Sequence, residues 1–148
     1  MSNPVPHVDP DLNGLPSELG NDDTTPVVML NLNRYRDIAD YGDGRDEQVS
    51  GREAYMRYGL VAFAALGNVG ARILWSTDAH EVVIGCEHDR YDEVIAVWYP
   101  SRAAFLRLAE HPGYLEALAH RTAALEQATL IACAASPTPE LSTPFAGS

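Results

Sequence analysis

The chain of 148 residues contains no lysine, and its ten basic side chains are all arginine. Without lysine there is no residue to form a Schiff base, to hold pyridoxal phosphate or to serve as the lysine of a Walker phosphate loop. Acidic residues outnumber the arginines and give a formal net charge of −11. This charge repels nucleic-acid phosphates and anionic lipid headgroups, so we expect neither nucleic acid nor a membrane as a partner.

The sequence is also poor in cysteine and in metal-binding spacings. Cys86 and Cys133 form no CxxC pair, and we interpret both as inert thiols beside apolar residues. The run at 86–93 (CEHDRYDE) is rich in possible ligands, but it lacks a spacing such as HxH or HExxH, so a solvated turn explains it better than a metal site. No dinucleotide loop occurs either. We therefore expect no metal and no organic cofactor.

Long apolar runs are missing as well. No segment approaches the roughly 20 apolar residues that a membrane helix needs. The first residues lack the basic and apolar parts of a secretory signal. These two observations predict a cytoplasmic protein.

The composition divides the chain into three parts: an N-terminal arm (1–25), one folded domain (26–135) and a Pro/Ser/Thr-rich tail (136–148) that we predict to be disordered. Helices are expected to begin after Ser50, which forms a capping box with Glu53, and after Ser101. Strands are predicted near 26–32, 71–76, 81–85, 94–99 and 129–135, and helices near 51–66, 101–110 and 112–127. This order predicts an α+β fold of the ferredoxin-like type, βαββαβ with an extra strand, in which helices cover one face of an antiparallel sheet.

Two of the predicted strands, 27–32 and 94–98, are apolar on both faces. Helices can cover only one face of such a sheet, so the second face must be buried by something else. A second copy of the same sheet is the economical solution, and we expect a homodimer.

Several ordered segments resemble one family. They are PVVMLNLNRYR (26–36), SGREAYMRYG (50–59), GARILW (70–75), YDEVIAVWYPSRAAFL (91–106) and YLEALAHRTAAL (114–125). Together they are similar to the bacterial proteins grouped as domain of unknown function 1330, within the dimeric α/β-barrel superfamily. The resemblance implies a barrel-like dimer with one pocket per subunit, between the sheet and its helices. Relatives in the superfamily include cofactor-independent quinol oxygenases, muconolactone isomerases, polyketide cyclases and haem enzymes, so the resemblance implies no single reaction.

Polar and aromatic side chains at strand ends and on helix faces are the candidate ligand contacts. Asn31 interrupts an apolar strand, where it either fixes a neighbouring loop or contacts an oxyanion. The other candidates are packing residues or substrate-binding residues: Arg34, Tyr55, Tyr58, Trp75 and Tyr99. Aromatic rings with polar tips on one sheet–helix space would suit a flat conjugated ligand.

The pair His120–Arg121 is the sharpest polar feature. Arg121 shares a helical stripe with Tyr114, Leu118 and Leu125, and a charge on such a stripe is rarely buried without a partner. That partner is either an internal acid, Asp92 or Glu93, or the carboxylate or enolate of a substrate. His120 lies at the edge of the stripe, where it is either exposed or a general base.

Two functions follow from these residues. The preferred one is a cofactor-independent isomerase, cyclase or oxygenase of secondary metabolism that acts on an enolisable, largely apolar or aromatic metabolite. In this scheme a base, either His120 or a pocket carboxylate, removes a proton while Asn31 and Arg121 stabilise the oxyanion. The alternative is a non-catalytic small-molecule-binding dimer. Both predict a pocket, but only the enzyme requires a titrating group directed into it.

Overall fold

The computed structural model describes residues 24–140 of the chain. The predicted arm (1–25) therefore lies almost wholly outside the described residues, as does most of the predicted tail (136–148). Of that tail, residues 136–140 are described, and the Ser136 carbonyl accepts a hydrogen bond of 3.0 Å from the Trp98 indole. Within residues 24–140, no helix is both long enough and apolar enough to cross a membrane.

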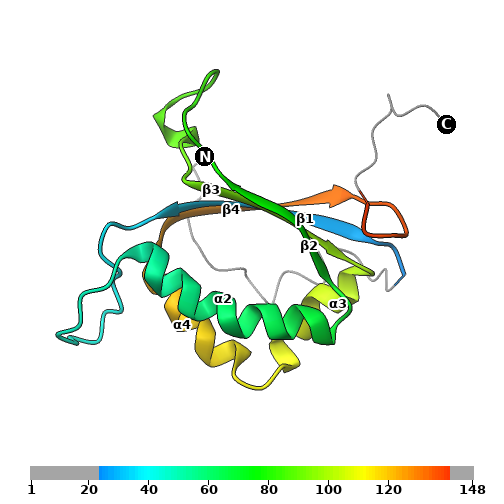
Figure 1. Cartoon of the computed structure of the whole chain (residues 1–148), viewed down its shortest axis with the longest axis horizontal. Coiled ribbons are helices and arrows are strands. Elements are labelled where there is room, and N and C mark those ends of the chain that lie inside the picture. The colour runs from blue at the N-terminus through cyan, green and yellow to red at the C-terminus, as the bar shows by residue number, and fades with distance from the viewer. Residues whose placement is uncertain (1–23, 141–148) are drawn as a thin grey trace, which may run out of the picture.

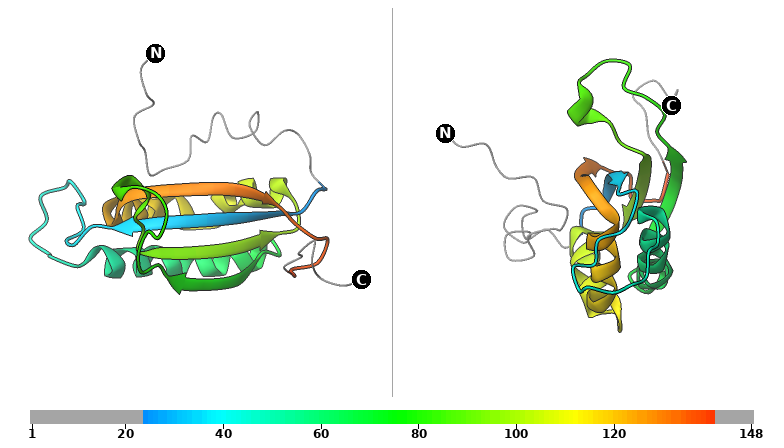
Figure 2. Two further views of the ribbon diagram at one scale, coloured as in Figure 1. Left: turned by 90° about the horizontal axis from the view of Figure 1, so that it is seen from above. Right: turned by 90° about the vertical axis from the view of Figure 1, so that its left-hand side faces the viewer.

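The fold is α+β and ferredoxin-like, as predicted. Four antiparallel strands form one sheet in the order β2–β3–β1–β4, with β1 (Val27–Tyr35) and β3 (Glu93–Tyr99) in the centre and β2 (Arg72–Asp78) and β4 (Leu125–Ala134) at the edges. Figure 1 shows the helices on one side of this sheet, and the view from above in Figure 2 shows the strand order. With its helices, the order of elements is the βαββαβ arrangement.

The extra strand predicted at 81–85 is absent. These residues lie in a loop, with bends at 83–85, that contains the short 3₁₀ helix η1 (Glu87–Asp89) and rises from the sheet on the side away from the helices (Figure 1). Val83 and Ile84, which suggested a strand, are 85 % and 96 % exposed. The prediction was wrong because an apolar run becomes a strand only when a neighbouring strand pairs with its backbone, and this segment has no such neighbour among the described residues.

Capping residues set the helix boundaries. α2 (Gly51–Asn68) begins at Ser50, whose hydroxyl accepts the Glu53 amide, and α3 (Arg102–Leu106) begins at Ser101, whose hydroxyl accepts the Ala104 amide. A 3₁₀ helix, η2 (Arg107–Glu110), continues from α3, and α4 (Tyr114–Ala124) follows. α4 passes directly into β4 at Leu125, so the last helix is shorter than predicted.

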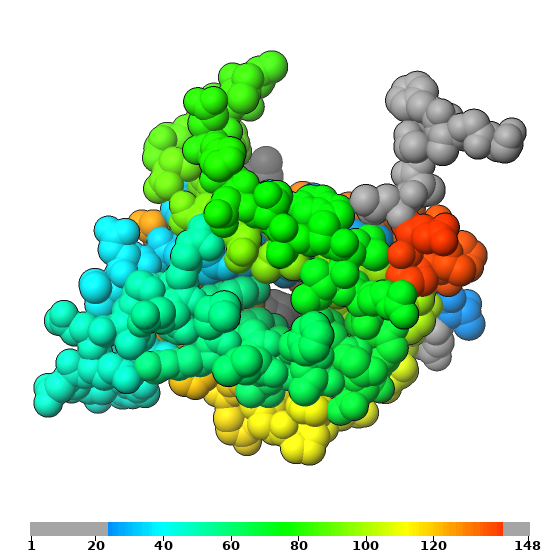
Figure 3. All heavy atoms as spheres, in the orientation of Figure 1, coloured from blue at the N-terminus to red at the C-terminus, as the bar shows by residue number. Residues whose placement is uncertain are grey.

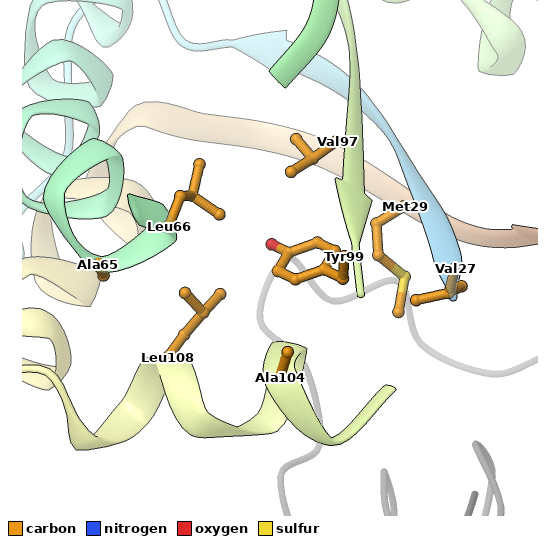
Figure 4. Packing of buried hydrophobic residues seen from close by; sticks show 8 residues of the cluster. All are labelled: Val27, Met29, Ala65, Leu66, Val97, Tyr99, Ala104 and Leu108. Atoms are coloured by element: carbon orange, nitrogen blue, oxygen red, sulfur yellow. The ribbon is translucent and has the colours of Figure 1, made fainter. Parts of the chain in front are cut away.

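The core between sheet and helices consists of two apolar clusters at opposite ends of β1. One cluster contains Val27 and Met29 with Tyr99, Leu66 and Leu108. In Figure 4 the Tyr99 ring lies among these side chains and its hydroxyl points toward Leu66 on α2. The other cluster contains Tyr35, Ala54, Ala124 and Leu125. The stretch of β1 between the two clusters carries polar side chains.

Candidate functional site

The polar section of β1 lies against tyrosines of α2. Alternation along the strand directs Asn31 and Asn33 to the same face as Val27 and Met29, which is the face that the helices cover. The side-chain amide of Asn31 makes two long hydrogen bonds, to the carbonyls of Met29 at 3.4 Å and Ile95 at 3.3 Å. Both are weak by ordinary criteria, so this amide retains capacity for a better partner.

A hollow lies beside Asn31, between the sheet and the α3–α4 side of the helical layer. The space between protein atoms there measures about 650 Å³, and this value includes space that is open to solvent. Its wall consists mostly of apolar side chains from β1, β3, β4 and the segment 105–118. Its polar lining residues are Asn31, Tyr58, Tyr99, Tyr114 and Arg121. Among the described residues of this wall, Arg121 is the only charged one.

A second hollow adjoins the first, with about 590 Å³ of space between protein atoms when space open to solvent is included. The two share four lining residues, Asn31, Tyr58, Tyr99 and Leu108. The second extends between α2 and the β2 side of the sheet, and Figure 3 shows the molecule hollowed there. Its described lining residues include Tyr55 but no charged side chain.

Arg121 is buried, at 8 % exposure, on the face of α4 that its apolar spacing predicted. Its positive charge favours the ionised form of three neighbouring phenols, and this effect lowers the pKa of Tyr55, Tyr58 and Tyr114. Burial works more strongly in the opposite direction and raises the pKa of all three, that of Tyr55 to about 12. The phenols are therefore neutral near pH 7 and available as hydrogen-bond donors.

The tyrosines form a continuous aromatic row under the sheet. The rings of Tyr35 and Tyr55 lie 5.3 Å apart, those of Tyr55 and Tyr58 5.4 Å, and those of Tyr58 and Tyr114 5.9 Å. The hydroxyls of Tyr58 and Tyr114 are hydrogen-bonded at 2.9 Å. Each ring thus fixes the orientation of the next, and the row ends beside Arg121.

The two acids considered as partners of Arg121 are engaged elsewhere. Asp92 accepts the Tyr35 amide at 2.8 Å and lies 3.5 Å from Arg90. Glu93 accepts the Tyr35 hydroxyl and lies 3.9 Å from Arg52. These contacts hold the far end of the aromatic row.

His120, the predicted base, is not among the lining residues of either hollow. Its Nδ1 lies 2.7 Å from the Tyr41 hydroxyl, which also accepts a hydrogen bond from Arg57. The pKa of His120 is lowered by burial first and by Arg57 and Arg45 next. The structure therefore places His120 in a contact between α4 and the loop at 36–50, away from Arg121's hollow.

Two further predicted contacts lie on other surfaces. Arg34 donates from Nε to the carbonyl of Arg90 at 2.7 Å and from Nη2 to that of Glu87 at 2.9 Å, so it holds the loop at 79–92. Trp75 pairs with Ala96, whose side chain belongs to the apolar cluster on the sheet face opposite the helices. A register shift between Ile73 and Trp75 causes this placement.

Tyr114 is the residue of the site that the predicted set omitted. It precedes Arg121 by seven residues and lies on the same predicted helical stripe, so its position was predicted although its place in the site was not. Phe105, which packs against Tyr99 with ring centroids 5.4 Å apart, carried no comparable signal. Within the described residues, no group of three or more His, Cys, Asp or Glu side chains is placed to hold a metal ion.

Comparison with known proteins extends this description. Residues 45–135 match the family described as Domain of unknown function (DUF1330). A solved structure of the RPA0582 protein of unknown function from Rhodopseudomonas palustris is 32 % identical, with a TM-score of 0.77, covering 89 % of this chain and 98 % of that one. The methylated RPA0582 protein gives 35 % identity and a TM-score of 0.79, covering 88 % and 96 %. No curated protein matches the chain.

A more distant solved structure is a dimeric ferredoxin-like protein of unknown function from Thermobifida fusca. It is 12 % identical, with a TM-score of 0.45, and the match covers 76 % of this chain and 92 % of that one.

Proposed function

The chain belongs to the family of domain of unknown function DUF1330, and from the geometry of its hollows we propose that it binds a small, largely apolar metabolite bearing an anionic or carbonyl oxygen. The observation that carries this proposal is the composition of the first hollow. Its wall is apolar apart from five polar side chains, each of which can donate a hydrogen bond, and one of these is the buried guanidinium of Arg121.

The donors match an oxygen ligand in both charge and geometry. A guanidinium presents a planar fork of N–H groups that suits a carboxylate or an enolate. The hydroxyl of a neutral Tyr58 or Tyr114 and the amide of Asn31 add donors beside it. In a largely apolar wall such interactions are stronger than in water, so they select for the ligand's charge.

Binding rather than proton abstraction is the role that the lining favours. An enzyme acting on an enolisable substrate needs a base directed at the substrate. Among the described lining residues of both hollows there is no Asp, Glu, His or Lys, and the candidate His120 bonds Tyr41 instead.

A cofactor-independent isomerase, cyclase or oxygenase is the second candidate, and one contact favours it. The hydrogen-bonded pair Tyr58–Tyr114 lies next to the positive charge of Arg121. This pair would stabilise a developing oxyanion, with Asn31 beside it, on a substrate acidic enough to need no strong base.

Calorimetric titration with a matched set of ligands tests the proposal. We expect benzoate and phenylacetate to bind, and benzyl alcohol and benzylamine to bind much more weakly or not at all. Arg121→Met should abolish the preference for the carboxylates, because methionine fills a similar volume without the charge. Binding of benzylamine as tight as that of benzoate, or no binding of any carboxylate, would contradict the proposal.

We further propose that the chain works as a homodimer assembled through the sheet face away from the helices. On that face Val28, Ala96 and Trp98 form a buried apolar cluster, while Trp75 and Ile131 nearby are 37 % and 44 % exposed. Apolar side chains exposed together on one sheet face favour contact with a second sheet.

A further inference from the structure

We infer that the ligand of this site is an amphipathic monocarboxylic acid with an extended apolar tail, its head at Arg121 in the first hollow and its tail in the second. This inference rests on the proposed function and adds the shape and polarity of the ligand. Three features of the second hollow carry it.

The first feature is the adjacency of the hollows together with their difference in charge. They share the wall formed by Asn31, Tyr58, Tyr99 and Leu108. Among described residues, the first hollow has one charged lining side chain and the second has none. A single ligand that occupies both therefore needs one anionic end and a body that tolerates an apolar wall.

The second feature is the rim of the second hollow. Phe63 of α2 and Ile73 of β2 line it and are 70 % and 42 % exposed. Large apolar side chains that remain in water around an opening suit the passage of an apolar chain, which they cover as it enters.

The third feature is Gly59, in the middle of α2. It lines the second hollow, and a Cβ atom added there would meet no other atom within 4 Å. Packing therefore does not explain a glycine here, although glycine destabilises a helix interior relative to alanine. A side chain at this position would project into the hollow, so the glycine keeps that space open.

The tyrosine rings at the junction suit such a tail. Tyr58 and Tyr99 belong to both walls, and their phenols stay neutral because burial raises the pKa of each. Flat ring faces contact methylene groups without placing a charge beside them. The apolar tail would pass between the two hollows at this point.

A chain-length series of straight-chain acids tests the inference on the full protein. Titration calorimetry would compare butanoate, hexanoate, octanoate and decanoate with the matching alcohols. We expect affinity to rise about fourfold for each methylene buried in the second hollow, and the alcohols to bind at least tenfold more weakly than the acids.

The variant Gly59→Leu distinguishes binding of the ligand's tail from binding of its head, because the new side chain would occupy the second hollow. The control is Ala64→Leu, since Ala64 is an exposed α2 residue outside both hollows. Gly59→Leu should weaken decanoate at least tenfold and leave benzoate unchanged, and the control should change neither. Circular dichroism verifies that each variant folds. If benzoate binds while affinity stays flat along the series, the tail inference is overturned and the proposed function stands. If no acid binds, both are overturned.

Discussion

At the scale of single residues, Arg121 is the side chain on which the proposed site depends. We expect Arg121→Met to change the free energy of unfolding by less than about 1.5 kcal/mol, since the replacement roughly conserves volume on an apolar stripe. The affinity for benzoate should fall by about 2 to 5 kcal/mol, the typical effect of removing one partner from a buried charge pair.

Thermal melting distinguishes this outcome from a structural role. If Arg121 neutralises an acid inside the protein, the same substitution leaves a buried carboxylate unpaired and lowers stability by roughly 3 to 5 kcal/mol. Unchanged melting together with unchanged benzoate affinity would remove Arg121 from the site altogether.

His120 should make the stability depend on pH in a defined window. Burial and the neighbouring Arg57 and Arg45 lower its pKa in the folded protein. An unfolded histidine titrates near pH 6.5, so the unfolded state binds more protons below that value. The stabilising contribution of neutral His120 is thus complete above about pH 6.5 and is lost as the pH falls through its lower folded pKa.

The variant His120→Gln isolates this effect from the other histidines. We expect the Tm of the wild type to fall more between pH 7.5 and pH 5.5 than the Tm of the variant, because only the wild type protonates this side chain. The difference should be small, since the contact is partly solvated. Equal slopes for the two proteins would show that protonation of His120 does not affect folding.

At the scale of elements, two of the glycines in α2, Gly51 and Gly59, lie in opposite surroundings. Gly51 begins the helix where β1 and α4 end, and its amide donates to the Arg36 carbonyl at 3.0 Å. A Cβ atom added there would lie 2.3 Å from the Arg36 oxygen and 2.7 Å from the Ala124 oxygen. Both are backbone atoms, so the start of the helix would have to move.

These surroundings predict opposite effects of the same substitution. Gly51→Ala should destabilise the protein by at least about 2 kcal/mol, because overpacking against backbone atoms cannot relax through a rotamer change. Gly59→Ala should stabilise it by about 0.5 to 1 kcal/mol, the helix-propensity difference, since its Cβ meets no atom. Urea unfolding of both variants measures the two values, and a loss of stability in Gly59→Ala would contradict the open space assigned to that position.

Periodicity explains which parts of the fold and the site could be predicted from the sequence. The 3.6-residue period placed Tyr55, Tyr58 and Arg121 on helix faces that meet the sheet, and strand alternation placed Asn31 on the covered face. The cap residues Ser50 and Ser101 predicted the starts of two helices. These features are local, so the sequence specifies them directly.

The features that could not be predicted depend on contacts between distant segments. Trp75 changes face because of a bulge in the β2–β3 pairing, and one shifted residue reverses every later side chain. His120 bonds Tyr41, which is 79 residues away in the chain. The position of Arg34, by contrast, could have been predicted. Strand alternation places Arg34 on the sheet face opposite Asn31, and therefore outside the hollow.

At the scale of the whole molecule, the sheet has one face covered by helices and one face that is largely apolar without them. The loop at 79–92 stands above this second face (Figures 1 and 2) and carries the exposed Val83 and Ile84. A partner sheet lying against the face would cover Trp75 and Ile131, and the loops would reach over its edge. The dimer would thereby bury the most exposed apolar side chains of the loop.

The homodimer can be tested with charges placed on that face. Light scattering at micromolar concentration should give a dimer for the wild type and a monomer for the double variant Trp75→Arg, Ile131→Lys, because two unpaired charges would have to be desolvated in the interface. Met56→Lys is the matched control, since Met56 is 66 % exposed on α2 and outside the proposed interface. It should remain dimeric. A monomeric wild type, or a double variant that stays dimeric, would show that the apolar face is not where two copies meet.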